Sequence, residues 1–495
     1  MMGGADPYDL LPYHGVAIPP TRPEHLALCS WIYGGPLPRR RGYSVLEIGC
    51  AEGSNLLPLA FYRPDITALG VDRSRLQIAE ARSAVDSLGL ENVRFECLDL
   101  RELADQQTEG PFDFIIAHGV LSWIPMDAQE ALLELCSRRL APRGLVYMSY
   151  NVDPGWRLRG VVREVMLREV GDIRDVPERT RLAQESARGY LELITPYVDH
   201  PYCAILQREL ELLAKTDTSK VAHDQLEENN HAFFFHELNT RIERHGLVHV
   251  ADAGFEPTEG ACLVRVRESL QQQGLSGVNL ELCSDLLCNR QLRSSVLCSA
   301  EDFAPPGPGA AVLMSEDITL ETRLSPTRDS IDLAAGVEEL FADRSGLSYR
   351  CDDPLLKAAL FTLARAETKL PTGPDVLREA ERTIESTGMT VGRGQADELV
   401  QDLFELHERG LIRLWLDRPR LAEAYRPVAH DLARLEASRG VPLTTPWHTQ
   451  IVLEDEEREL IARLDGEADL EAEGIEELIQ ALGAAGLLVR GDNSP

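Results

Sequence analysis

Short apolar runs alternate with longer amphipathic stretches in the first third of the chain. The apolar runs occupy residues 44–49, 66–72, 93–100, 112–119 and 144–151. Residues 74–89 and 127–140 repeat apolar side chains at i, i+3 and i+4, which is the spacing of one helix face. We expect Ser74 to cap the first of these helices, Gly89 to end it, and Asp127 to cap the second.

This alternation predicts βαβ units on a parallel sheet, a Rossmann-like α/β domain whose ligands bind at the carboxyl ends of the strands. Strand signals fade after residue 156, and residues 157–303 are expected to form a mainly helical domain. The proline and glycine cluster at residues 304–311 predicts a linker.

Beyond the linker the pattern changes again. Residues 312–324 read as an extended segment, and residues 397–416 give a helix, a turn at Gly410 and an apolar strand. That order is typical of a winged-helix-like α+β module. The predicted domains are therefore residues 1–156, 157–303 and 304–495.

Length and charge narrow the classes of function. A chain of 495 residues exceeds what one hydrophobic core usually supports, so several domains are expected. The net charge of −31 argues against nucleic acid as a partner. It fits a cationic partner such as a lysine-bearing protein, and it also fits solubility alone. No apolar run approaches the ~20 residues of a membrane helix and no signal peptide is evident, so we expect a cytoplasmic protein without membrane insertion.

The loop VLEIGCAEGSN at residues 45–55 follows the first predicted strand. Its glycines do not match G-x-G-x-x-G, because Ala51 stands where the second glycine would be. A ligand without a phosphate is therefore favoured, and S-adenosylmethionine (SAM) fits. Its amino-acid part would cross the turn at Gly49, with the Glu47 carboxylate near its ammonium, since a buried carboxylate needs a partner. The alternative is a turn that only joins the strand to its helix.

Acidic residues also end the second and third predicted strands. Asp72 lies where a carboxylate can accept both ribose hydroxyls, and Asp99 lies where one can accept the adenine amine. The fourth strand ends in a turn at His118 and Gly119, whose carbonyls can face the ammonium. In this order, these residues favour a methyltransferase.

Several segments resemble the bacterial class I SAM-dependent methyltransferases that carry a methyltransferase regulatory domain, a group that includes rickettsial protein lysine methyltransferases. They are residues 8–26, 118–125, 149–156, 224–238, 285–298 and the C-terminal segment 426–466. The resemblance covers nearly the whole chain, and it is specific to the architecture rather than to one substrate.

The resemblance implies roles for individual residues. Cofactor contacts are expected from Glu47, Gly49, Cys50, Ala51, Gly53, Asn55, Asp72, Arg73, Asp99, Leu100, His118 and Gly119, with Tyr13, and Tyr8 beside it, folding over the cofactor. Acceptor recognition and catalysis are expected from Trp123, Tyr150, Asn151 and Trp156. Val152 and Asp153 replace a frequent Thr-Tyr pair, which leaves the lysine acceptor open. No metal is predicted.

The predicted function is SAM-dependent N-methylation of a protein or peptide, on a lysine-type amine. Tyr150 with Asn151 would orient the amine, and Asp153 or His118 would receive its proton. Two alternatives stay open: a biosynthetic methyltransferase acting on N, O or carboxyl groups of a peptide natural product or metabolite, and a non-catalytic SAM-binding scaffold. The oligomeric state is also open, a homodimer being one option.

Overall fold

The structure is a computed structural model. It describes residues 15–105, 110–227, 229–254, 257–328, 330–343, 346–366, 370–417, 425–465 and 475–490.

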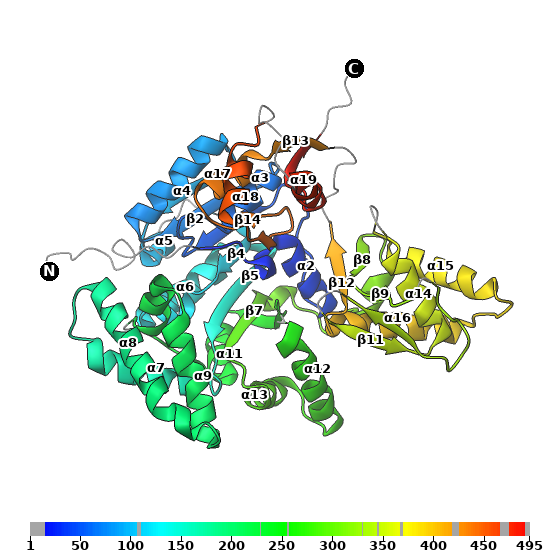
Figure 1. The fold of residues 1–495 in the computed structure, drawn as a ribbon, viewed down its shortest axis with the longest axis horizontal. Helices are drawn as coiled ribbons and strands as arrows, with labels where there is room; N and C mark the ends of the chain where they lie inside the picture. Colours follow the sequence, from blue (N-terminus) through cyan, green and yellow to red (C-terminus); the bar gives the residue numbers. More distant parts are fainter. Residues whose placement is uncertain are drawn as a thin grey trace.

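A seven-stranded sheet lies at the centre of the fold (Figure 1). In spatial order its strands are β3 (Val93–Cys97), β2 (Thr67–Asp72), β1 (Ser44–Ile48), β4 (Phe112–Ala117), β5 (Leu140–Asn151), β7 (Leu292–Ser299) and β6 (Leu247–Asp252). Strands β1 to β5 pair in parallel, whereas β7 runs antiparallel to both β5 and β6. The five strands expected from the apolar runs are confirmed. Strand β4 is buried along its whole length, as parallel strands covered on both faces are.

Helices connect the parallel strands and cover the sheet. They include α3 (Leu56–Tyr62), α4 (Arg75–Leu88), α5 (Leu100–Asp105) and α6 (Met126–Arg139). The expected ends of α4 are confirmed, because the Ser74 hydroxyl accepts a hydrogen bond from the Gln77 amide and Gly89 adopts a left-handed conformation with φ of 60°. The expected cap of α6 was wrong. Pro125 is its N-cap, since its extended backbone leads directly into the helix, and Asp127 lies in the first turn.

Residues 157–303 contain more than helices. Helices α7 (Arg157–Val170), α8 (Val176–Ile194), α9 (Pro201–Lys215), α11 (Phe235–Arg244), α12 (Pro257–Gln272) and α13 (Gly277–Leu287) agree with the expectation. Strands β6 and β7 were missed, and they complete the central sheet. The sheet therefore extends past residue 156, which the sequence suggested as its boundary.

The following segment, drawn in yellow-green to orange in Figure 1, shares a core with helix α2 (Pro23–Ile32). Its strands β8 (Ile318–Thr322) and β12 (Ile412–Leu416) pair antiparallel, and helices α14 (Pro354–Ala364), α15 (Gly373–Glu385) and α16 (Arg393–Glu408) share a core with them. The expected helix, turn and strand are present as α16, Gly410 and β12. The expected extended segment 312–324 was wrong at its start, because Gly309–Met314 is a 3-10 helix.

The last part of the chain returns to the central sheet. It contains β13 (Tyr425–Ala429), α17 (Asp431–Ser438), β14 (Leu443–Thr444), β15 (Gln450–Ile451), α18 (Asp455–Ala462), α19 (Ile475–Ala484) and β16 (Leu488–Arg490). His430 packs edge-on against the rings of Phe61 and Tyr62 in α3, so this C-terminal module contacts the helix that follows the glycine loop.

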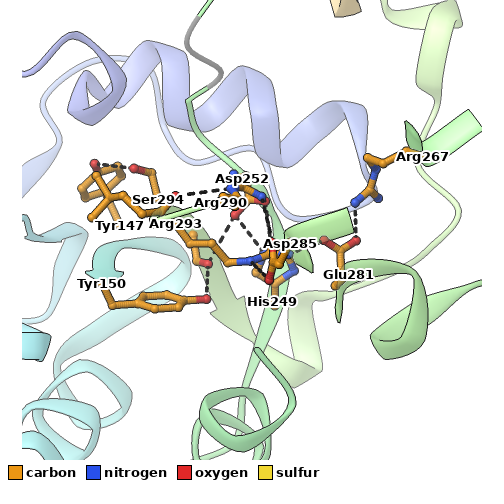
Figure 2. Close-up of polar contacts among 12 residues, drawn as sticks. Tyr147, Tyr150, His249, Asp252, Arg267, Glu281, Asp285, Arg290, Arg293 and Ser294 are labelled. Atoms are coloured by element: carbon orange, nitrogen blue, oxygen red, sulfur yellow. Dashed lines mark hydrogen bonds and ion pairs between the residues drawn. The ribbon is translucent and has the colours of Figure 1, made fainter. Parts of the chain in front are cut away.

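A buried arginine joins β7 to its surroundings (Figure 2). Arg293 is 0% exposed, and its guanidinium forms ion pairs of 2.7–2.9 Å with Asp252, Glu281 and Asp285. It also lies over the Phe235 ring at 4.4 Å. This network fixes β6, β7 and α13 to one another.

We expect Arg293→Met to lower the free energy of unfolding by roughly 3–5 kcal/mol, because the fully buried Asp285 loses its close counter-charge and keeps only Arg290 at 3.9 Å. Urea denaturation measures this change. The control is Arg138→Met, since Arg138 pairs with Glu134 at the surface and is 68% exposed; there we expect little change. Equal effects of the two substitutions would contradict the role of the network.

Candidate functional site

A cavity of about 1430 Å³ opens at the carboxyl ends of the parallel strands. The sequence-predicted residues that line it are Glu47, Gly49, Cys50, Ala51, Asn55, Asp72, Arg73, Asp99, Leu100, His118, Gly119, Trp123, Asn151 and Trp156. Gly53 and Tyr150 do not line the cavity. Tyr8 and Tyr13 lie outside the described residues.

Glu47 is the most constrained group in this cavity. Its side chain is 4% exposed, and Oε1 accepts a hydrogen bond of 2.8 Å from the Asn55 amide. Oε2 is buried and has no hydrogen-bond partner within the described part of the chain. Burial raises the pKa of Glu47 to about 8. Near pH 7 the ligand-free carboxyl therefore keeps its proton, and an ammonium group placed beside Oε2, as in SAM, would favour the ionised form.

The glycine loop adopts a backbone conformation that needs glycine at two positions. Gly49 has φ of 72°, and a Cβ at this position would lie 2.6 Å from Cγ2 of Val120. Gly53 has φ of 84° and packs against the Phe95 ring, so its role is to shape the loop rather than to line the cavity. The pKa of the Cys50 thiol is raised well above its usual value by burial, which makes this cysteine unreactive.

Two carboxylates stand at the ends of the next strands. Asp72 accepts hydrogen bonds from the Ala51 amide at 3.0 Å and the Ser74 amide at 2.8 Å, so it joins the loop to the start of α4. Asp99 pairs with Arg101 at 2.7 Å, and hydrogen bonds from this guanidinium hold the pKa of Asp99 below its usual range. Asp99 is therefore ionised at neutral pH, and its oxygens can accept hydrogen bonds.

Strand β5 divides its side chains between two faces. Tyr147, Ser149 and Asn151 line the cavity. Tyr150 points to the other face, where its hydroxyl lies 3.0 Å from Oγ of Ser295 (Figure 2). This placement does not agree with the expected contact between Tyr150 and the acceptor, because neighbouring residues of a strand point to opposite sides. Tyr147 was missed, although the same alternation, counted from Asn151, identifies it.

A series of hydrogen-bonding groups begins at the Tyr147 hydroxyl. Its hydroxyl donates to Oγ of Ser294 at 3.1 Å and lies 3.0 Å from Nδ1 of His118. The same nitrogen lies 3.3 Å from Oγ of Ser149, which accepts the Gly119 amide at 2.8 Å. Burial lowers the pKa of His118 to about 4 and raises that of Tyr147 to about 12, so both are neutral near pH 7.

Two tryptophans form the next part of the wall. The Trp123 and Trp156 rings meet edge to face at 6.0 Å, and the Arg159 guanidinium lies 4.9 Å from the Trp156 ring centre. Among the described residues, Asn151 Nδ2 and Trp156 Nε1 are buried without a hydrogen-bond partner. Asp153, which the sequence suggested as a proton acceptor, does not line the cavity and pairs with Arg157 at 2.8 Å.

The helical segment closes the cavity opposite the strand ends, which the sequence did not predict. Its lining residues are Leu212, Thr216, Asp217, Lys220, His223, Asp224, Gln225, Glu227 and Asn229. Val221–Gln225 forms a π-helix, a feature that often marks functional sites. Burial raises the pKa of Asp224 to about 6.

The described ranges contain neither an arrangement of metal ligands nor a helix that could span a membrane. No group of three or more histidine, cysteine or acidic residues there has the arrangement of a metal site. None of the helices in these ranges has the length and apolar character needed to span a membrane.

A parallel sheet with a glycine turn and acidic strand ends is typical of α/β proteins that bind a nucleoside-containing ligand. Residues 39–186 match the family model described as a methyltransferase domain, and residues 217–299 match a predicted methyltransferase regulatory domain. The chain is similar to the uncharacterized proteins RP789 (35% identity, 59% of this chain, 52% of the relative) and RP028 (30% identity, 48% and 94%), both from Rickettsia prowazekii. It thus spans about half the length of RP789.

The fold matches a solved structure over nearly the whole chain. PKMT2 from Rickettsia typhi, in complex with AdoHcy, aligns with a TM-score of 0.76 at 23% identity, covering 98% of this chain and 94% of that one. The chain belongs to the class I SAM-dependent methyltransferases that carry a methyltransferase regulatory domain. Its cofactor is S-adenosylmethionine.

The raised pKa of Glu47 predicts how stability varies with pH. Between pH 4.5, the ordinary pKa, and about 8, the folded protein keeps a proton that the unfolded chain releases. The stabilisation from this group is therefore present at low pH and is lost as the pH rises towards 8. In the ligand-free protein, Glu47→Gln should raise the melting temperature at pH 8.5 relative to wild type and lose this advantage at pH 5.

Thermal melts at the two pH values measure the difference. Glu80→Gln, on the exposed face of α4, is the matched control and should follow wild type. A Glu47→Gln variant with the same pH dependence as wild type would contradict the buried, protonated state of Glu47.

Proposed function

We propose that this protein is a cytoplasmic N-methyltransferase that transfers the methyl group of SAM to a lysine-type amine of a protein or peptide. The observation that carries the proposal is the continuity of the cavity. It runs from the Glu47 end, which suits a cofactor ammonium, to a wall of two tryptophans, Asn151 and carboxylates from the helical segment.

The proposed cofactor roles follow the chemistry of each group. Glu47 Oε2 receives the ammonium, Asp72 accepts the ribose hydroxyls, and Asp99 with Leu100 borders the adenine. Gly49 and Ala51 let the ligand pass close to the backbone. When bound, SAM supplies a methyl group on a positively charged sulfur, so the protein must orient the acceptor, exclude water and remove a proton.

The acceptor wall suits an amine. Tryptophan rings attract cations, and Arg159 already lies 4.9 Å from the Trp156 ring centre, so a lysine side chain would use the Trp123 ring. The amine must lose its proton before it attacks. Asp224, with a pKa of about 6, is ionised near neutral pH and can take that proton. Asn151 Nδ2 is buried without a partner and can orient a carbonyl or hydroxyl next to the amine.

Labelling tests the function. The protein is incubated with methyl-labelled SAM and a lysate of its own organism, with Asp72→Ala as the control that cannot hold the cofactor. Label on lysine side chains of a protein supports the proposal. Label only in small molecules that pass a filter favours the biosynthetic alternative. No transfer, with SAM still bound, favours the scaffold.

Two tyrosines of β5 give a matched pair for the acceptor site. Each phenol bonds one serine of β7, but only Tyr147 of the two faces the cavity. We expect Tyr147→Phe to lower kcat about tenfold, because it removes a polar contact to His118, and Tyr150→Phe to change kcat by less than about twofold. Equal kcat values for the two variants would contradict the assignment of the cavity face.

A further inference from the structure

A loop of the C-terminal module reaches the cofactor end of the cavity. We name residues 443–451, which include β14 and β15, the latch loop. Thr449 and Gln450 line the cavity, and the side-chain amide of Gln450 donates a hydrogen bond of 3.1 Å from Nε2 to the Ala17 carbonyl. At its other end the Tyr62 hydroxyl donates to the Thr444 carbonyl at 2.9 Å. The latch loop therefore contacts a cavity wall at Ala17 and, outside the cavity, helix α3 at Tyr62, both far away in the sequence.

His448 makes the central contact of this loop. Its Nε2 lies 3.0 Å from the Asn55 carbonyl, and the imidazole is 2% exposed. Burial lowers the pKa of His448 to about 3, so the ring is neutral. Because a carbonyl only accepts hydrogen bonds, the proton lies on Nε2, and His448 donates it to Asn55.

Asn55 connects His448 to Glu47, the residue proposed to hold the cofactor ammonium. Its Nδ2 donates to Oε1 of Glu47 at 2.8 Å, and its Oδ1 accepts from the Ile18 amide at 2.8 Å and from the Thr21 hydroxyl at 3.1 Å. The amide is thus fixed in one orientation, with its nitrogen towards Glu47. A shift of the Asn55 backbone would therefore move both the Glu47 carboxylate and the N-terminal segment that bonds Asn55 through Ile18 and Thr21.

The backbone of the latch loop holds His448 in an unfavourable conformation. Its φ of 59° lies in the left-handed region, which disfavours residues with a Cβ. The Thr445 hydroxyl accepts from the Trp447 and Thr449 amides, and the His448 amide donates to the Thr445 carbonyl at 2.9 Å. These bonds maintain the turn that aims the imidazole at Asn55, and such strain often marks a functional position.

We propose that His448 is a positioning residue for cofactor binding. By donating to the Asn55 carbonyl, the docked latch loop holds the Asn55 amide against Glu47 and thereby presents Oε2 to the SAM ammonium. The proposal rests on the proposed cofactor role of Glu47 and not on the identity of the acceptor. Because coupling is reciprocal, SAM in turn stabilises the docked latch loop.

The test measures the affinity of the full-length protein for SAM by calorimetry. His448→Asn is the main variant, since asparagine tolerates positive φ but is too short to reach the Asn55 carbonyl. We expect SAM to bind about five- to tenfold more weakly, the effect of one lost hydrogen bond. His448→Gln, which restores a donor at the original reach, should return the affinity to within about twofold of wild type.

The control is Tyr62→Phe. It removes another hydrogen bond to the latch loop without touching Asn55, so the affinity for SAM should stay within about twofold of wild type. Wild-type affinity in His448→Asn, or an equal loss in Tyr62→Phe, would overturn the inference. The expected result is a loss confined to His448→Asn.

Glu47→Gln separates failure of this inference from failure of the proposed cofactor site. If Glu47→Gln binds SAM as tightly as wild type, the proposed site is wrong. If Glu47→Gln binds weakly while His448→Asn binds normally, only the positioning role is wrong. In the double variant, His448→Asn should add less than its own effect, because both substitutions act through the same carboxylate.

Discussion

The cofactor end of the cavity depends on one buried carboxyl group, Glu47, which has one oxygen without a hydrogen-bond partner among the described residues. Glu47 lies one residue before the end of β1, between β2 and β4, and is 4% exposed. Asn55 satisfies one oxygen, and the other is left towards the cavity. A buried oxygen without a partner lowers the free energy of unfolding of the ligand-free protein. A cationic ligand that pairs with this oxygen removes that cost, so the group favours binding at the expense of stability.

Three distant parts of the chain meet at Asn55. Its side chain bonds Glu47 of the sheet and Ile18 of the N-terminal segment, and its carbonyl accepts from His448 of the C-terminal module. The helical segment closes the same cavity from another side. The cofactor end is therefore not a property of the α/β domain alone, which gives a physical reason for the long C-terminal extension to pack back onto α3.

The sequence predicted what depends on local pattern. The five parallel strands, the ends of α4 and the glycine loop follow from apolar periodicity, capping residues and turn chemistry. Strands β6 and β7 were missed because β7 carries Arg293 and serines, which interrupt the apolar pattern expected of a strand in a central sheet. The charge of Arg293 is balanced by Asp252 and Asp285, which come from other elements. The sequence motif places Tyr150 at the acceptor, whereas the alternation of side chains along β5 turns Tyr147 to the cavity and Tyr150 away from it. The contacts of Asp224 and His448 depend on tertiary packing, which no local pattern contains.

The central claim is that Glu47 and the strand-end aspartates hold the cofactor within this cavity. A crystal structure of the protein with S-adenosylhomocysteine tests it most directly. We expect the ligand ammonium about 3 Å from Oε2 of Glu47 and the ribose hydroxyls on Asp72. A ligand bound with its amino-acid part elsewhere, leaving Oε2 without a partner, would contradict this assignment.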